Sequence, residues 1–227
     1  MKTLLLLHGA IGSSAQLETL KEQLSSSYAV HTINFPGHGG TALPLSFNMS
    51  LFANAVQNFI QEHALGTVSI VGYSMGGYVA LYLAKHHPEL VEKVVTLATK
   101  FEWDEAIAAK EVKMLQPEVI EQKLPAFAKT LEERHTPEDW KQVLIKTKEM
   151  LLGLGKQNNL TLADYASIQT PVQLLLGDRD KMVGLEETVA VYKQLPNGQL
   201  GVLPGTPHPI EQVDVALLAF HVRRFIG

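Results

Sequence analysis

The sequence predicts an α/β fold, with a mostly parallel sheet of six or more strands, helices on both faces of the sheet, and a small helical insertion. Short apolar runs alternate along the chain with longer segments of helical spacing, which is typical of repeated βαβ units. The alternation stops once, from about residue 101 to residue 166, where no strand pattern occurs. Amphipathic helical stretches fill this part of the chain instead.

Six short apolar runs are interpreted as strands. In chain order they are Thr3–Leu7, Tyr28–Ile33, Thr67–Val71, Val91–Ala98, Val172–Leu176 and Gln199–Leu203. Helical spacing is found in Ser14–Leu24, Ser50–Glu62, Met75–His86, Glu186–Gln194 and Ile210–Ile226. Ser50 is expected to cap its helix, because a serine side chain accepts hydrogen bonds from the free amides of a first helical turn.

Residues 1–100 and 167–227 are expected to form one α/β core, with residues 101–166 inserted as a helical cap. A chain of 227 residues with 46% apolar content fits one core with an insertion better than two domains. The cap is predicted to hold two or three helices, broken by Pro117, Pro125, Pro137 and the pair Gly153 and Gly155. It is expected to cover the carboxyl edge of the sheet.

The composition indicates a small-molecule substrate. The formal net charge of −4 is spread over 19 basic and 23 acidic residues without long runs, so no footprint for nucleic acid or an anionic membrane is present. With no cysteine, disulfides, thiol nucleophiles and thiolate zinc sites are excluded. The run Leu4–Leu7 is too short for a secretory signal, and no segment approaches the roughly 20 apolar residues of a membrane span. A soluble, cytoplasmic protein without cofactor or metal is therefore expected, and nothing in the sequence indicates its oligomeric state.

The most specific motif is Gly72-Tyr73-Ser74-Met75-Gly76, which directly follows one predicted strand and opens the helix that runs to His86. This G-x-S-x-G pattern, placed between a strand and a helix, is the nucleophile elbow. The sharp turn presents the serine side chain above the sheet, next to the positive end of the helix. The alternative interpretation is a glycine-rich strand-to-helix turn in which Ser74 is only a helix cap.

A serine nucleophile needs a base and a group that orients the base. His208 is the predicted base, since it lies between the last predicted strand and helix, where Pro207 and Pro209 restrict the loop. The acid is expected directly after Val172–Leu176, in Gly177-Asp178-Arg179-Asp180. Asp180 is favoured because the later residue can reach back toward His208, whereas Asp178 fits a turn-stabilising role. These aspartates do not indicate a metal site, because no second ligand cluster has suitable spacing.

Two backbone amides are predicted to bind the oxyanion. One belongs to Met75, the residue after the nucleophile, and the other to Ala10 in the glycine-containing loop after the first strand. The same loop does not indicate dinucleotide binding, since it lacks the G-x-G-x-x-G pattern and no acidic residue ends the second strand.

On these motifs the chain resembles the α/β-hydrolase superfamily over essentially its full length. The matches are His8-Gly9, the segment Phe35-Pro36-Gly37-His38-Gly39, the elbow Gly72–Gly77, and the Asp180 and His208 loops. The resemblance implies a triad of Ser74, Asp180 and His208, an oxyanion hole from the Ala10 and Met75 amides, and a cap at about 101–166. Within the superfamily the motifs look like those of small capped esterases and of menaquinone-pathway lyases. Those lyases typically carry an arginine after the elbow glycines, where this chain has Tyr78.

The expected activity is that of a carboxylesterase, which hydrolyses a small, weakly charged carboxylic ester or thioester through an acyl-enzyme on Ser74. A lyase or C–C bond hydrolase with the same triad is the first alternative, and a non-catalytic small-molecule binding protein on this fold is the second. The residues expected to line the substrate pocket are Ile11, Tyr78, Trp103, Met114, Phe127 and Trp140. For the aromatic residues and Met114 of the insertion, the alternative role is the core of the cap.

Overall fold

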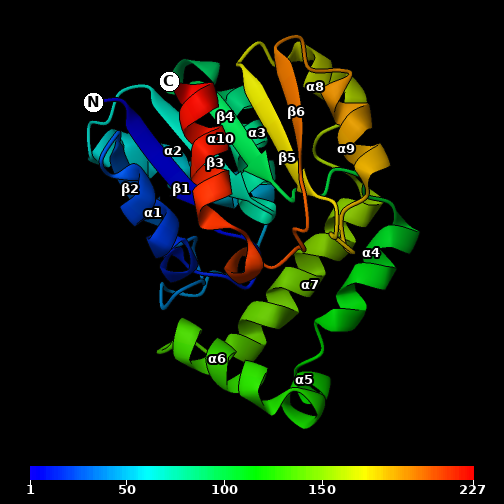
Figure 1. The fold of residues 1–227 in the computed structure, drawn as a ribbon. Coiled ribbons are helices and arrows are strands. Elements are labelled where there is room, and N and C mark those ends of the chain that lie inside the picture. Colours follow the sequence, from blue (N-terminus) through cyan, green and yellow to red (C-terminus); the bar gives the residue numbers. More distant parts are fainter.

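Six parallel strands form the centre of the molecule, as the sequence predicts (Figure 1). The computed structural model describes residues 1–227. The strands lie in the order β2-β1-β3-β4-β5-β6, and every adjacent pair is parallel. They are β1 Thr3–Leu7, β2 Ala29–Ile33, β3 Val68–Tyr73, β4 Val91–Leu97, β5 Val172–Gly177 and β6 Gly198–Leu203.

The sheet is buried on both faces, and β1 shows how. Because successive side chains of a strand point to opposite faces, Leu5 and Leu7 join one apolar cluster while Leu4 and Leu6 join the other. All four are fully buried. This is why the strand is a continuous apolar run rather than an alternating one.

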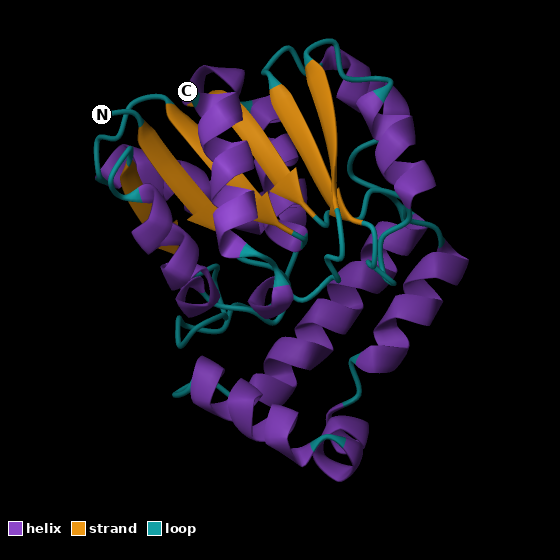
Figure 2. Cartoon of the chain, viewed as in Figure 1, coloured by secondary structure: helices purple, strands orange, loops and turns teal.

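Helices cover each face of the sheet (Figures 1 and 2). On one face α1 (Glu18–Leu24) and α10 (Val215–Ile226) pack on the smaller of the two clusters. On the other face α2 (Met49–Glu62), α3 (Met75–His86) and α9 (Leu185–Tyr192) pack on the larger one. No helix combines the length and the apolar character needed to cross a bilayer.

The segment between β4 and β5 contains helices and no strand. It contains five α-helices, more than the two or three expected, because Pro117 and Pro125 each begin a helix, where a missing N–H costs nothing. The helices are α4 Glu105–Glu111, α5 Pro117–Lys123, α6 Pro125–His135, α7 Trp140–Lys156 and α8 Leu162–Ser167. Helices α4 to α7 lie toward the carboxyl ends of the strands, whereas α8 lies beside α3 and α9, near the amino end of β5 (Figures 1 and 2).

Helix α7 runs through Gly153 and Gly155, so the expectation that these glycines interrupt the helix is wrong. A Cβ at Gly155 would lie 2.5 Å from the Cβ of Ala108 in α4. The glycine thus lets two helices of the insertion pack closely. Helix α8 ends at Ser167 and places Tyr165 in the larger core cluster, so the insertion and the core share apolar side chains.

Two further expectations are corrected. Asn48, not Ser50, caps α2, since its Oδ1 atom accepts from the Leu51 amide at 2.8 Å. Ser50 instead donates to Asn48 Oδ1 at 2.7 Å. The final helical segment is two elements, because a 3₁₀ turn at Ile210–Gln212 precedes α10. The carboxylate of Asp214 caps α10 by accepting hydrogen bonds from two of its backbone amides.

Candidate active site

Ser74 lies between the last residue of β3 and the first residue of α3. Its backbone has φ 51° and ψ −118°, a region that residues other than glycine rarely occupy. Its N–H donates to the Leu97 carbonyl at 2.8 Å, and its own carbonyl accepts from the Thr99 hydroxyl at 2.9 Å. The end of β4 therefore holds the strained turn through both backbone groups of Ser74.

Close backbone packing explains the elbow glycines. A Cβ at Gly76 would collide with the carbonyl oxygens of Leu7 and His8, and a Cβ at Gly72 would collide with the backbone of Gly76. Helix α3 can therefore begin directly against β1 only if both positions lack a side chain. The result is a rigid support beneath Ser74.

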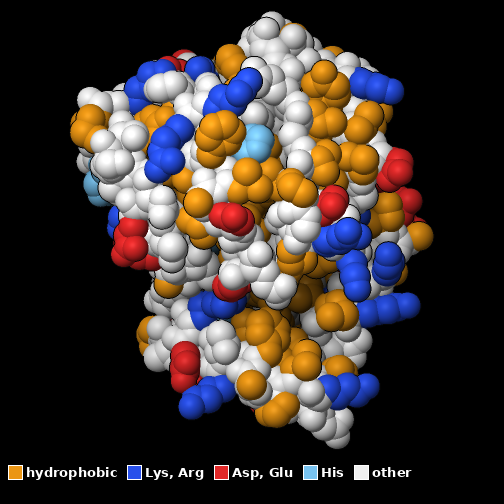
Figure 3. Space-filling view, viewed as in Figure 1, with side chains coloured by type: hydrophobic (Ala, Val, Ile, Leu, Met, Phe, Trp, Pro, Cys, Tyr) orange, Lys and Arg blue, Asp and Glu red, His pale blue; other side chains and the backbone are white.

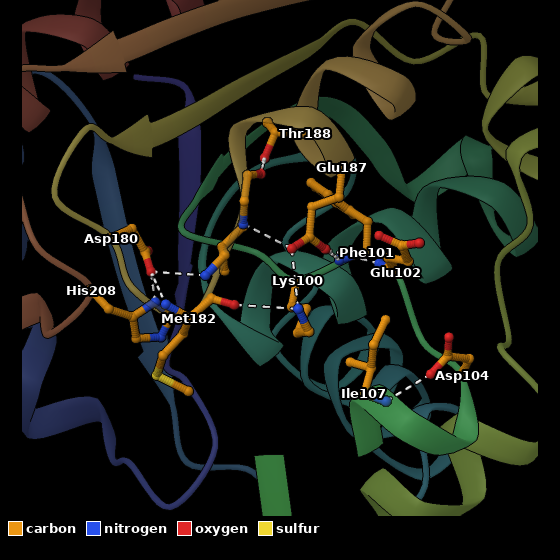
Figure 4. Close-up of polar contacts among 12 residues, drawn as sticks. Lys100, Phe101, Glu102, Asp104, Ile107, Asp180, Met182, Glu187, Thr188 and His208 are labelled. Atoms are coloured by element: carbon orange, nitrogen blue, oxygen red, sulfur yellow. Dashed lines mark hydrogen bonds and ion pairs between the residues drawn. The ribbon is translucent and has the colours of Figure 1, made fainter. Parts of the chain in front are cut away.

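His208 and Asp180 form a hydrogen-bonded pair, with 2.8 Å between His208 Nδ1 and Asp180 Oδ2 (Figure 4). The other oxygen of Asp180 accepts from the amides of Met182 at 2.8 Å and Val183 at 2.9 Å. Burial alone would raise the pKa of Asp180, but the hydrogen bonds from His208 and the two amides outweigh it and hold the pKa below its usual value. The side chain of Asp180 is 1% exposed and that of His208 is 12% exposed. Asp180 is therefore a buried carboxylate that orients the imidazole.

Asp178, the competing aspartate, has a different partner. Its Oδ1 atom accepts from the backbone N–H of Thr206 at 3.3 Å. Asp178 thus joins the loop after β5 to the loop that carries His208, without contacting the imidazole through a hydrogen bond.

Tyr73 connects the His208 loop to the elbow. Its hydroxyl donates to the backbone carbonyl of His208 at 3.1 Å, and the two ring centroids are 5.6 Å apart. Tyr73 directly precedes Ser74, and His208 is bonded to Asp180. The structure therefore brings the predicted nucleophile, base and acid to one edge of the sheet. No hydrogen bond joins the Ser74 hydroxyl to the His208 ring, whose one side-chain hydrogen bond is to Asp180.

The loop after β1 is organised by His8, whose side chain is fully buried. Its Nε2 atom accepts from the Phe35 amide at 3.1 Å, so we assign the proton to Nδ1, which lies 2.7 Å from the Gly9 carbonyl oxygen. The Gly12 amide also donates to that oxygen, at 3.2 Å. Burial lowers the pKa of His8 to about 4 and keeps the ring neutral.

This arrangement orients the amide of Ala10. The Gly9 carbonyl and the Ala10 N–H belong to one planar trans peptide and point in opposite directions. Fixing the Gly9 oxygen therefore fixes the direction of the Ala10 N–H, which makes no hydrogen bond within the chain. The other predicted donor, Met75, is the first residue of α3, where a helix leaves its N–H without a helical partner.

Sequence reasoning missed Glu187 in α9. Its carboxylate accepts from the amides of Phe101 and Glu102, both at 2.9 Å, and from the Gly184 amide at 2.9 Å (Figure 4). It also pairs with Lys100 at 3.1 Å, although its side chain is only 6% exposed. One buried carboxylate thus ties the start of the insertion to the loop that follows Asp180. The sequence gives no signal for these contacts, since an acidic residue in the first turn of a helix is common.

The pocket residues predicted in the core have mixed surroundings. Ile11 is half-buried, and its backbone lies in the left-handed region at φ 51°. Tyr78 is buried, and its hydroxyl bonds to Asn158 Oδ1 at 2.5 Å and accepts from the Leu160 amide at 2.8 Å. Burial raises the pKa of Tyr78, so the hydroxyl stays protonated. Tyr78 therefore holds the loop between α7 and α8 against α3.

The residues predicted in the insertion are spread over it. Trp103 packs on the larger core cluster and lines a hollow of about 310 Å³ beside α8 and α9. Met114 and Phe127 are exposed. Trp140 is buried in a small cluster with Leu131 and three other residues, so it forms the core of the cap, which was its alternative role. Pocket roles for the other predicted residues stay predictions; these are Ile11, Tyr78, Trp103, Met114 and Phe127.

A larger hollow of about 780 Å³ lies within the insertion, between residues 121 and 141, and does not include Ser74, Asp180 or His208. On the face shown in Figure 3, apolar side chains gather around a depression where the insertion meets the core. No group of three or more His, Cys, Asp or Glu side chains is arranged to hold a metal ion.

The doubly covered parallel sheet, with a strained serine at a strand-to-helix turn, defines the class of α/β enzymes built around a nucleophile elbow. Residues 2–137 match the profile of the family described as alpha/beta hydrolase fold. The chain belongs to this family. Membership of the family, together with the esterase relatives described below, indicates that the chain is an enzyme.

Relatives and solved structures agree with this assignment. The pimeloyl-[acyl-carrier protein] methyl ester esterase of Vibrio campbellii is 25% identical over 98% of this chain and 93% of its own length. The structure of MenH from S. aureus superposes with a TM-score of 0.80 and 19% identity, covering 99% of this chain and 93% of that one. MGS-M2, an alpha/beta hydrolase enzyme from a Medee basin deep-sea metagenome library, gives a TM-score of 0.84 with 14% identity, covering 100% of this chain and 89% of that one. At these identities the two structures support the fold.

Proposed function

We propose that this chain is a serine hydrolase that cleaves a small, weakly charged carboxylic ester or thioester through an acyl-enzyme on Ser74. The observation that carries the proposal is the 2.8 Å hydrogen bond from His208 to the buried carboxylate of Asp180, at the sheet edge where the strained Ser74 lies. The Vibrio campbellii relative, a methyl ester esterase, supports ester chemistry at this site.

The first half of the reaction forms the acyl-enzyme. Because His208 Nδ1 donates to Asp180, its Nε2 atom is free to accept the proton of the Ser74 hydroxyl as Oγ bonds to the substrate carbonyl carbon. The carbonyl oxygen becomes an oxyanion, which the amides of Ala10 and Met75 bind. The protonated His208 then gives its proton to the leaving alcohol or thiol as the bond to the acyl carbon breaks.

The second half releases the acid. His208 Nε2 takes a proton from a water molecule as the water oxygen attacks the acyl carbon, and the same amides bind the second oxyanion. Collapse of this intermediate breaks the bond to Ser74 Oγ, which recovers its proton from His208. Asp180 stays ionised throughout, since the hydrogen bonds it accepts keep its pKa low.

The charge near the site favours a weakly charged substrate. Arg134 is half-buried but already paired, since it contacts the Ile11 carbonyl and Glu211. The position after the elbow glycines is Tyr78, whose hydroxyl is bonded to Asn158 and Leu160. Neither side chain is free to hold a polyanion, whereas the depression in Figure 3 is apolar.

Turnover of p-nitrophenyl acetate tests the proposal. Ser74→Ala is expected to lower kcat by at least about 1,000-fold, because nothing else supplies the attacking oxygen. Ser167→Ala, at an exposed serine of α8, is the matched control and is expected to leave kcat unchanged.

Labelling by a fluorophosphonate separates the alternatives. Stoichiometric labelling at Ser74 without ester turnover would favour the lyase or C–C bond hydrolase. Absence of both labelling and turnover would favour a binding protein and would overturn the proposal.

A further inference from the structure

Two consecutive residues of the insertion contact the loop that carries the Ala10 amide. Arg134 Nη1 donates to the backbone carbonyl of Ile11 at 3.0 Å, and His135 Nε2 lies 3.1 Å from the same oxygen. Arg134 and His135 are the last two residues of α6, more than 120 positions from Ile11 in the chain. The insertion therefore holds this loop through a single carbonyl oxygen.

The histidine is fixed in the orientation and protonation state that this contact needs. His135 Nδ1 accepts from the Gly39 amide at 3.2 Å, which leaves the proton on Nε2, facing Ile11. The side chain is fully buried. His135 thus connects the loop after β2 to the loop after β1.

The arginine reaches the other side of the site. Arg134 Nη2 lies 3.7 Å from Glu211 Oε1, which also accepts from Gln16 Nε2 at 2.6 Å. Gln16 Oε1 in turn accepts from the Ser13 amide at 3.0 Å. Glu211 follows His208 by three positions, so this chain of contacts links the insertion, the loop of Ala10 and the segment after the base.

The carbonyl they hold belongs to a strained residue. Ile11 has φ 51°, a backbone region in which a β-branched side chain is unfavourable. Without partners for its carbonyl, Ile11 would gain free energy by relaxing to a negative φ. The Ile11 carbonyl and the Gly12 N–H belong to one planar peptide, and the Gly12 N–H donates to the Gly9 oxygen that sets the direction of the Ala10 N–H. That relaxation would therefore break this hydrogen bond and let the Ala10 amide turn away.

We propose that Arg134 and His135 are positioning residues that hold the Ala10 amide in place to bind the oxyanion, so that docking of the insertion assembles the oxyanion hole. This inference rests on the proposed function. Neither side chain contacts the reacting atoms, and their effect reaches the chemistry through the Ile11 carbonyl. Small displacements of such a donor are costly, because an oxyanion hole acts through fixed geometry.

The test compares Arg134→Met, Arg134→Lys and His135→Gln with the parent. Arg223→Met is the matched control, since Arg223 also donates to a backbone carbonyl, that of Gln23, on the helix pair α1 and α10. The measurements are kcat and KM for p-nitrophenyl acetate, and the inhibition constant of an alkyl trifluoromethyl ketone, which forms an oxyanion adduct with the serine. Circular dichroism establishes that each variant is folded.

We expect Arg134→Met to lower kcat about tenfold with KM within twofold, and to weaken ketone binding by the same factor as kcat. Arg134→Lys is expected to keep most of the kcat and ketone affinity that Arg134→Met loses, because a lysine ammonium can still donate to the Ile11 carbonyl. Should Arg134→Met not fold, His135→Gln provides the same comparison. Arg223→Met is expected to match the parent in all three constants.

The inference is overturned if folded Arg134→Met and His135→Gln keep kcat and ketone affinity within twofold of the parent. It is also overturned if kcat falls while ketone affinity is unchanged, since the lost effect would then lie outside the oxyanion hole. An inactive parent that does not bind the ketone would instead refute the proposed function, and this inference with it.

Discussion

Replacing Asp180 by asparagine is expected to invert the tautomer of His208. In the parent, one oxygen of Asp180 accepts from two backbone amides, of Met182 and Val183, and the other accepts from His208 Nδ1. An asparagine has only one oxygen, and the two fixed amides hold it. The NH₂ group then faces His208 Nδ1, which can accept its hydrogen bond only by giving up its own proton.

The proton moved to Nε2 then points at Ser74, and the ring can no longer act as the base. A histidine in the wrong tautomer typically costs about 10³–10⁴ in kcat, or about 4–5 kcal/mol of activation free energy. The fold should persist, because asparagine keeps the shape of the side chain and the two backbone hydrogen bonds.

The assay is steady-state hydrolysis of p-nitrophenyl acetate by Asp180→Asn, with Asp178→Asn as the matched control from the same loop. Asp178 accepts from the Thr206 amide, a bond that asparagine can keep, and its only charged partner is the exposed Arg179 at 3.8 Å, so the kcat of Asp178→Asn should stay within about threefold of the parent. A kcat for Asp180→Asn within tenfold of the parent, or equal losses in the two variants, would refute the reasoning.

The remaining predictions concern stability. Glu187→Gln should lower the free energy of unfolding by about 3 kcal/mol in urea titrations, because an amide group cannot replace both carboxylate oxygens that accept from Lys100 and three backbone amides; a loss below 1 kcal/mol would contradict the network described for this carboxylate. Burial lowers the pKa of both His8 and His135 to about 4, so the unfolded chain binds more protons between pH 6.5 and pH 4. As the pH is lowered through this range, the free energy of unfolding should therefore fall by about 1.4 kcal/mol per pH unit for each histidine. A free energy of unfolding that stays constant from pH 6.5 to pH 5 would contradict the burial of these two histidines in the neutral form. Asn48→Ala should cost about 1 kcal/mol by thermal unfolding and Ser50→Ala clearly less, since only Asn48 accepts from a helix amide; the reverse order would restore the cap to Ser50.

The sheet was predictable because its strands are defined by local pattern. A short apolar run such as Leu4–Leu7 is typical of a strand that a parallel sheet buries on both faces, and all four side chains are buried. The elbow was predictable for a similar reason, since Gly72 and Gly76 allow a backbone approach that no side chain permits. Strand ends differ from the prediction by one or two residues, because hydrogen bonding between strands, not hydropathy, sets where β3 stops.

The sequence predicts helices between β4 and β5, but not their number or their bounds. Proline both ends helices and begins them, and the sequence does not say which role Pro117 or Pro125 takes. Glycine at 155 lowers helix propensity locally, yet close packing against Ala108 compensates for it within the folded chain.

The sequence alone thus determined the order of strands and helices along the chain, the elbow at Ser74, the base candidate His208 and the acid candidates Asp180 and Asp178, because these follow from short-range pattern and from loop position. Only the tertiary structure decided that Asp180 rather than Asp178 bonds to the imidazole, and that Glu187 and Arg134 hold the loops around it. Such contacts join groups distant in the chain, and their partners are fixed by packing in three dimensions. No spacing along the chain encodes them.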